Sequence, residues 1–109
     1  MAVVTFDPIV WPTHTLPVTV VDGQWTEFTL PISGDDLVVV NDLAVLVSFD
    51  PSLSDGLAVN KAAQRHETVG AGASPAYELG GTSRAEKFFV AGDGAAASII
   101  ATLSRGKQR

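Results

Sequence analysis

The feature that most constrains this chain is the run from Leu37 to Phe49, which reads LVVVNDLAVLVSF. Its second half is apolar at every second position, at Leu43, Val45, Val47 and Phe49. Alternate side chains of a strand lie on one face, so this half predicts a strand with one buried face and a mixed face that holds Ser48. Leu37–Val40 is apolar throughout, which predicts a strand covered on both sides. Asn41-Asp42 suits a two-residue turn. The run therefore predicts a central β-hairpin, with a partner-facing strand as the alternative.

The rest of the chain repeats this pattern of short strands between turn residues. Asp22-Gly23 predicts a second hairpin turn. Residues 57–59 are a possible short strand, 60–67 give at most one helical turn or an irregular strand, and 69–75 form a loop. Further strands are predicted over residues 16–21, 25–32, 77–79, 85–91 and 97–104. Seven to eight strands separated by turns predict an all-β fold, a single small β-sandwich that is jelly-roll-like or immunoglobulin-like.

A chain of 109 residues is long enough for one domain. We divide it into an extended N-terminal arm (1–13), a β-sandwich domain (14–106) and a basic C-terminal tail (107–109). Two prolines in the arm disfavour a regular strand. The arm also carries large apolar residues, and these form a candidate contact with a partner subunit: Phe6, Ile9 and Trp11. The alternative is that the arm packs along its own domain.

Charge is divided unevenly along the sequence. The net charge is -5, but residues 1–60 hold eight acidic residues and no Lys or Arg, whereas residues 61–109 hold seven basic and four acidic ones. Unlike halves suit head-to-tail packing of identical subunits, and chance segregation on a solvated surface is the alternative.

The residue chemistry predicts no catalytic, cofactor or metal site, and hence no enzyme. There is no cysteine, and the two histidines, His14 and His66, lie in different segments without a second ligand at metal spacing. The Asp residues between positions 35 and 55 lack the calcium-loop spacing, and Asp is favoured in turns for local backbone hydrogen bonds. No G-x-S-x-G elbow or P-loop occurs.

Composition also indicates which classes of partner the protein does not bind. An acidic chain predicts no nucleic-acid binding. The N-terminus does not read as a signal peptide, and no apolar run approaches the roughly 20 residues that span a bilayer, so we expect no membrane partner. Carbohydrate-binding sandwiches use aromatic platforms, for which the candidates are Trp11, Trp25 and Tyr77. A carbohydrate-binding module is therefore the alternative function.

Four segments carry a family resemblance: DGQWTEFTLP, VVVNDLAVLVSF, YELGGTSRAEKFFV and AAASIIATLSRG. Their strand pattern and turn placement resemble the small β-sandwich structural proteins of tailed bacteriophages, which are head-decoration and head-tail or tail accessory subunits. The resemblance implies a non-enzymatic, multi-copy virion protein made in the host cytoplasm. Its expected partners are copies of itself, in a homo-oligomer, and neighbouring virion proteins. No functional residue is carried over from the family.

Overall fold

The computed structural model describes residues 4–5, 13–29, 36–78 and 87–104, and every structural statement below concerns these residues. They form strands and connections without an α-helix. The strands are β1 (Val4–Thr5), β2 (Thr13–Val20), β3 (Thr26–Thr29), β4 (Asp36–Asn41), β5 (Val45–Ser48), β6 (Glu67–Val69), β7 (Ala76–Glu78), β8 (Lys87–Gly92) and β9 (Ala97–Ser104). Apart from the two-residue β1, eight strands have three residues or more.

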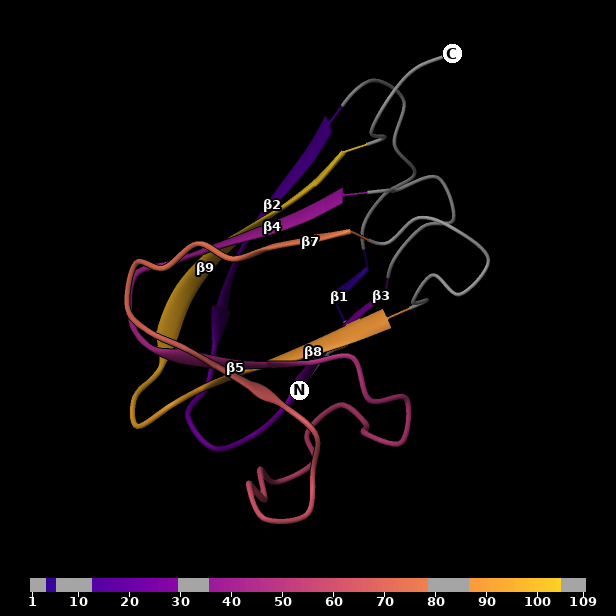
Figure 1. Cartoon of the computed structure of the whole chain (residues 1–109), viewed down its shortest axis with the longest axis vertical. Helices are drawn as coiled ribbons and strands as arrows, with labels where there is room; N and C mark the ends of the chain where they lie inside the picture. Colours follow the sequence, from indigo (N-terminus) through magenta and orange to yellow (C-terminus); the bar gives the residue numbers. More distant parts are fainter. Residues whose placement is uncertain (1–3, 6–12, 30–35, 79–86, 105–109) are drawn as a thin grey trace.

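The strands form two facing sheets (Figure 1). Sheet A has the order β1-β3-β8-β5-β6, and sheet B has the order β2-β9-β4-β7. From β2 onward, the first strand pairs with the last, the second with the second-last, and so on toward the middle of the chain. The pairs are β2 with β9, β3 with β8, β4 with β7 and β5 with β6, all antiparallel. This is the jelly-roll arrangement. The predicted small β-sandwich is confirmed, and its strand order is that of the jelly roll rather than of the immunoglobulin fold.

The predicted hairpin over Leu37–Phe49 is wrong, because β4 lies in sheet B and β5 in sheet A. The chain turns a corner between the sheets instead. Val39 and Val45, on either side of the corner, both point into the core between the sheets. A hairpin and a corner can bury the same side chains, so alternation alone does not distinguish them. The connection at Asp22-Gly23 is likewise a corner, since β2 and β3 are in different sheets.

These corners are tied to one another at one end of the sandwich (Figure 1). The Gly92 N–H donates to the Val21 carbonyl at 2.8 Å, which joins the β8–β9 corner to the β2–β3 corner. A Cβ at Gly92 would lie 2.1 Å from the Ala95 carbonyl oxygen, so only glycine fits this approach. The carboxylate of Asp42 accepts from the Ser98 N–H at 2.9 Å, which joins the β4–β5 corner to β9.

Asn41 fixes the β4–β5 corner from inside. Its buried side-chain amide donates to the carbonyls of Leu43, at 2.9 Å, and Gly70, at 2.8 Å. Its side-chain oxygen accepts from the Ser74 N–H at 3.1 Å. Every polar group of this buried side chain is thus used, as burial requires. Asn41 therefore connects the β4–β5 corner to the β6–β7 connection.

Two apolar clusters stabilise the fold. The larger lies between the sheets and consists of buried residues Val20, Phe28, Leu37, Val39, Val45, Val47, Val69, Phe88, Val90, Ala97, Ile99 and Ala101. The smaller lies on the outer face of sheet A, beneath the connection of residues 49–66, and consists of Trp25, Leu46, Leu53, Phe89 and Ala91. Strand β5 is therefore buried on both faces, and Ser48 on its predicted mixed face is only 2% exposed.

Shorter elements follow the sequence less closely. Residues 57–59 contribute only an isolated bridge between Gln24 and Ala58, not a strand. Residues 60–64 close one hydrogen-bonded turn, in which Asn60 caps Ala62. Strand β6 lies where the stretch predicted as one helical turn or an irregular strand ends and the predicted loop begins.

Within the described residues, strands from the two differently charged halves of the sequence lie side by side. The jelly roll pairs strands of the first half with strands of the second, as in β2 with β9 and β3 with β8. Accordingly Lys87 lies 3.9 Å from Glu27 of the acidic half. In the described part of the chain, the two halves therefore meet at this pair of strands.

The described residues of the predicted arm belong to strands of both sheets. Strand β1 pairs parallel to β3, with Val4 opposite Phe28, and β2 begins at Thr13. Phe6, Ile9 and Trp11, the predicted partner contacts, lie outside the described residues, as does the tail 107–109.

Candidate functional site

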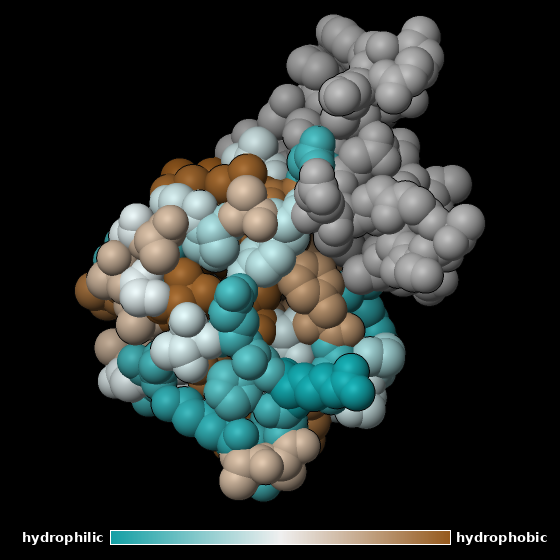
Figure 2. Space-filling view, in the orientation of Figure 1, coloured by the Kyte–Doolittle hydropathy of each residue, from teal (hydrophilic) through white to brown (hydrophobic). Residues whose placement is uncertain are grey.

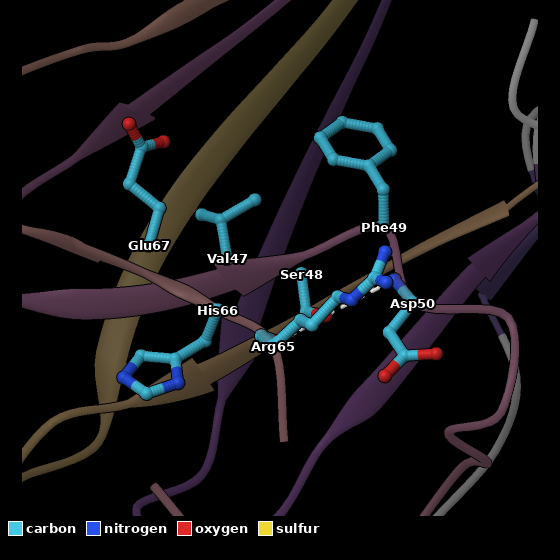
Figure 3. A pocket seen from close by; sticks show the side chains of 7 residues that line it. All are labelled: Val47, Ser48, Phe49, Asp50, Arg65, His66 and Glu67. Carbon is cyan, nitrogen blue, oxygen red and sulfur yellow. Dashed lines mark hydrogen bonds between the residues drawn. The ribbon is translucent and has the colours of Figure 1, made fainter. Parts of the chain in front are cut away.

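A small hollow lies beside the paired ends of β5 and β6 (Figure 3). Its volume is about 230 Å³, and it is lined by Val47, Ser48, Phe49, Asp50, Arg65, His66 and Glu67. Pockets that enclose small ligands usually measure about 300–1,000 Å³. The hollow is therefore small. It is a candidate active site because a hydroxyl (Ser48), an imidazole (His66) and two carboxyl groups (Asp50 and Glu67) line it.

The Ser48 hydroxyl and the Asp50 carboxylate are held by the local backbone. Ser48 Oγ donates to the Arg65 carbonyl at 2.6 Å and accepts from the Asp50 N–H at 3.1 Å. Asp50 Oδ1 accepts from the N–H and the hydroxyl of Ser52, at 3.0 and 2.8 Å. These bonds from Ser52, with the charge of Arg65, lower the pKa of Asp50 below its ordinary value. Asp50 therefore stays ionised and is a weak proton acceptor.

His66 does not complete a catalytic arrangement with these groups. Its Nδ1 lies 2.8 Å from the Gln64 carbonyl, so this nitrogen is the donor and Nε2 is the acceptor in the neutral ring. Figure 3 shows His66 and Asp50 on the side of the strands opposite Val47, Phe49 and Glu67. Ser48, His66 and Asp50 thus share a hollow, but their hydrogen bonds do not join one of these side chains to another: the Ser48 hydroxyl bonds to Asp50 only at its backbone N–H, and His66 bonds to the Gln64 carbonyl. A Ser-His-Asp triad requires a hydrogen bond between the serine hydroxyl and the histidine ring, and another between that ring and the aspartate.

Tyr77 and Glu67 close the side of the sandwich next to the hollow. The Tyr77 hydroxyl donates to Glu67 Oε1 at 2.5 Å, which joins edge strand β7 of sheet B to edge strand β6 of sheet A. The Tyr77 ring packs edge-on against Phe49, with centroids 5.1 Å apart. Burial and the neighbouring Glu67 raise the pKa of Tyr77. The phenol is therefore neutral and structural, and Glu67 is occupied by it.

The predicted aromatic platforms are not open to a sugar ring where the structure describes them. Trp25 is 0% exposed, and its indole N–H donates to Gln64 Oε1 at 2.8 Å beneath the 49–66 connection. Tyr77 is half-buried and holds the sheet edges together. Trp11 lies outside the described residues.

The predicted turn aspartates act on the backbone, although mostly over long range. Asp42 caps Ser98, Asp55 Oδ1 accepts from the Glu27 N–H at 3.0 Å, and Asp22 Oδ1 accepts from the Gly94 N–H at 2.8 Å. Among the aspartates just named and Asp50, all in the described part of the chain, Asp50 is the one that bonds locally, to Ser52. Within the described residues, no three of the His, Cys, Asp and Glu side chains come together where they could hold a metal ion.

A second candidate is a surface rather than a pocket: the outer face of sheet B. Its described outward residues are Pro17 and Thr19 on β2, Ser98, Ile100 and Thr102 on β9, Val38 and Val40 on β4, and Ala76 on β7. Ile100 is 43% exposed and Val40 is 42% exposed. Hydrophobic residues reach the surface over sheet B, along the upper left of Figure 2. The sequence indicated the β4 part of this face, as the alternative of a partner-facing strand, but not its neighbours on β2 and β9, because it paired β4 with β5 instead.

No protein-family model, curated protein sequence or solved structure matches this chain. None of the described residues belongs to a helix long and apolar enough to cross a membrane.

Proposed function

We propose that this protein is a non-enzymatic structural subunit of a tailed-bacteriophage virion, present in many copies, either as a capsid decoration or as a head-tail accessory protein. The observation that carries the proposal is the jelly-roll strand order, in which β2-β9-β4-β7 faces β3-β8-β5-β6. Viral capsid proteins, lectins and cupins share this architecture. The four segments that resemble phage structural proteins supply most of these strands.

The arrangement of side chains in the hollow supports a structural rather than a catalytic role. Ser48, Asp50 and Tyr77 each use their polar atoms to hold strand ends or edges in place. Because a jelly roll can host many activities, this use of the polar groups is an argument separate from the fold. The carbohydrate-binding alternative has less support, since Trp25 is enclosed and Tyr77 is bound to Glu67.

The proposal is tested on particles and on glycans. Antibody against this chain should label purified virions of the phage that carries it, and quantitative mass spectrometry should find many copies per particle. A glycan array should give no signal with the purified protein. Absence of the chain from virions would overturn the proposal, and binding to a defined glycan would favour the carbohydrate-binding alternative.

The N-terminal arm provides a sharper test of assembly. A domain with Trp11→Ser should fold and melt like the unchanged protein but be incorporated poorly into particles, because aromatic anchors contribute strongly to protein interfaces. A large fall in melting temperature with normal incorporation would show that Trp11 covers its own domain instead.

A further inference from the structure

We propose that the outer face of sheet B binds the same face of a second copy of this chain, with Ile100 at the centre of the contact. This inference rests on the proposed function, because a multi-copy subunit needs surfaces that meet. The inference adds which surface of the subunit makes the contact, because the jelly-roll fold alone does not specify one.

The strand register arranges this face as a small grid. Pro17 on β2, Ile100 on β9 and Val40 on β4 are directly opposite one another and form an apolar row across three strands. The row on one side carries the hydroxyl side chains of Thr19 and Ser98, and the row on the other side carries Thr102, Val38 and Ala76. The face is thus apolar at its centre, uncharged in both flanking rows and polar in part of its surround, as the core of a protein interface usually is.

Charge favours a second copy as the occupant. Along β4 the face is uncharged between Asp36 at one end and Asp42 at the other. The chain carries a net charge of -5, so two copies repel each other least when they meet through an uncharged face. Other described surfaces carry charges, including Glu67 and Arg65 beside the hollow and Asp22 at the corners. A basic partner would instead be drawn to acidic groups such as Asp22, which lie away from this face.

The size of the face predicts a weak contact. Four strands at about 4.8 Å spacing and six residues at about 3.4 Å per residue cover about 400 Å² in projection. A stable dimer usually buries about 800 Å² on each partner. The contact should therefore be weak between free subunits and become effective when many copies are held side by side.

Symmetry makes the contact self-complementary. A two-fold axis lying in the interface at Ile100 places this residue against its own symmetry mate, because an isologous interface uses one patch twice. The acidic ends of the face at Asp36 and Asp42 then lie at the rim. Screening of these ends by salt should strengthen the association.

The test compares the full-length protein with Ile100→Asp and with the matched control Leu57→Asp. Leu57 is 39% exposed, close to the 43% of Ile100, but lies on the 49–66 connection. Analytical ultracentrifugation from micromolar to millimolar protein should show self-association of the unchanged chain, weakened at least about tenfold by Ile100→Asp because like charges would face each other. Leu57→Asp should leave it unchanged.

Single cysteines give an independent result, since the chain has none of its own. Ile100→Cys should form a disulfide-linked dimer on mild oxidation, and Leu57→Cys should not. Equal cross-linking of both variants, or no self-association at millimolar concentration, overturns this contact. Self-association that persists in Ile100→Asp also overturns it while leaving the virion proposal standing. Absence of the chain from virions overturns the virion proposal and not a dimer measured in solution.

Discussion

The two outer faces of the sandwich differ in whether the chain covers their apolar side chains. On sheet A, the 49–66 connection lies over Trp25, Leu46 and Phe89 and encloses them in a second apolar cluster. On sheet B, the described connections stay at the ends of the strands, and Ile100 and Val40 remain open to solvent. A sheet face that stays in water usually carries polar or charged residues, and this one carries no charge between Asp36 and Asp42. One face is thus completed within the chain, and the other has the composition of a contact surface.

The largest difference in stability is expected when an aspartate is introduced on the covered face of sheet A and, for comparison, on the open face of sheet B. Ser48→Asp on β5 should prevent folding, because the side chain is enclosed under the 49–66 connection and its hydroxyl is bonded to Arg65. Val47→Asp should do the same from the core between the sheets. Val40→Asp on the open face should cost at most about 1 kcal/mol of unfolding free energy. Circular dichroism and thermal melts measure all three.

The sequence alone placed Ser48 on a mixed face, where an aspartate would be tolerated, whereas the structure buries this side chain, so Ser48→Asp distinguishes the two interpretations of β5. A folded Ser48→Asp protein with near-normal stability would mean that the 49–66 connection does not cover sheet A.

A smaller effect is expected when apolar volume is removed from each face. Trp25→Ala should lower the free energy of unfolding by about 3–5 kcal/mol, as for other large buried aromatic residues. Val40→Ala, at a 42% exposed position, should cost less than about 1 kcal/mol. Urea unfolding gives both values. Similar losses for the two variants would remove the distinction between a covered face and an open one.

The smallest effect is expected at the side where the edges of the two sheets meet. Tyr77 on β7 donates to Glu67 on β6, and its pKa is raised in the folded protein. Because the unfolded phenol ionises near pH 10 and the folded one ionises only at higher pH, the unfolded state is favoured as pH rises above about 10. The stability from the raised pKa is therefore fully present below that pH and lost above it.

Tyr77→Phe should be slightly less stable than the unchanged protein at pH 7 and should lose less stability between pH 9 and about 11. Thermal melts across this range measure the difference. Parallel alkaline losses in both proteins would show that Tyr77 does not couple the sheet edges.

The sequence was informative about where strands lie and much less so about which strands pair. The pattern predicted the last strand at its observed bounds, Ala97–Ser104, because Ile99 and Ala101 alternate with outward residues and glycines precede them. The pairing of β4 with β9 and β7, rather than with β5, depends on contacts between residues far apart in sequence. Asn41 illustrates this: the sequence marks it as a turn residue, and only the fold brings Gly70 and Ser74 to its amide.

The candidate surfaces were predictable to different degrees. The burial of Trp25 could not be predicted from the sequence, since nothing local shows that residues 49–66 return over sheet A. The row of Pro17, Ile100 and Val40 joins three segments and becomes a surface only through their register.

The pairing of β2 with β9 also has a consequence during synthesis. Val20 pairs with Ala97, so roughly 80 residues must be added before β2 meets its neighbour, which takes about 4–16 s at ordinary translation rates. For those seconds the nascent chain carries a strand with no partner, a state that invites pairing with other nascent chains. Pro17 lies in the middle of that strand and lacks an N–H, which removes one donor from the unpaired edge. The residue at one end of the apolar row on the finished sandwich thus also protects the chain while it waits for its last strand.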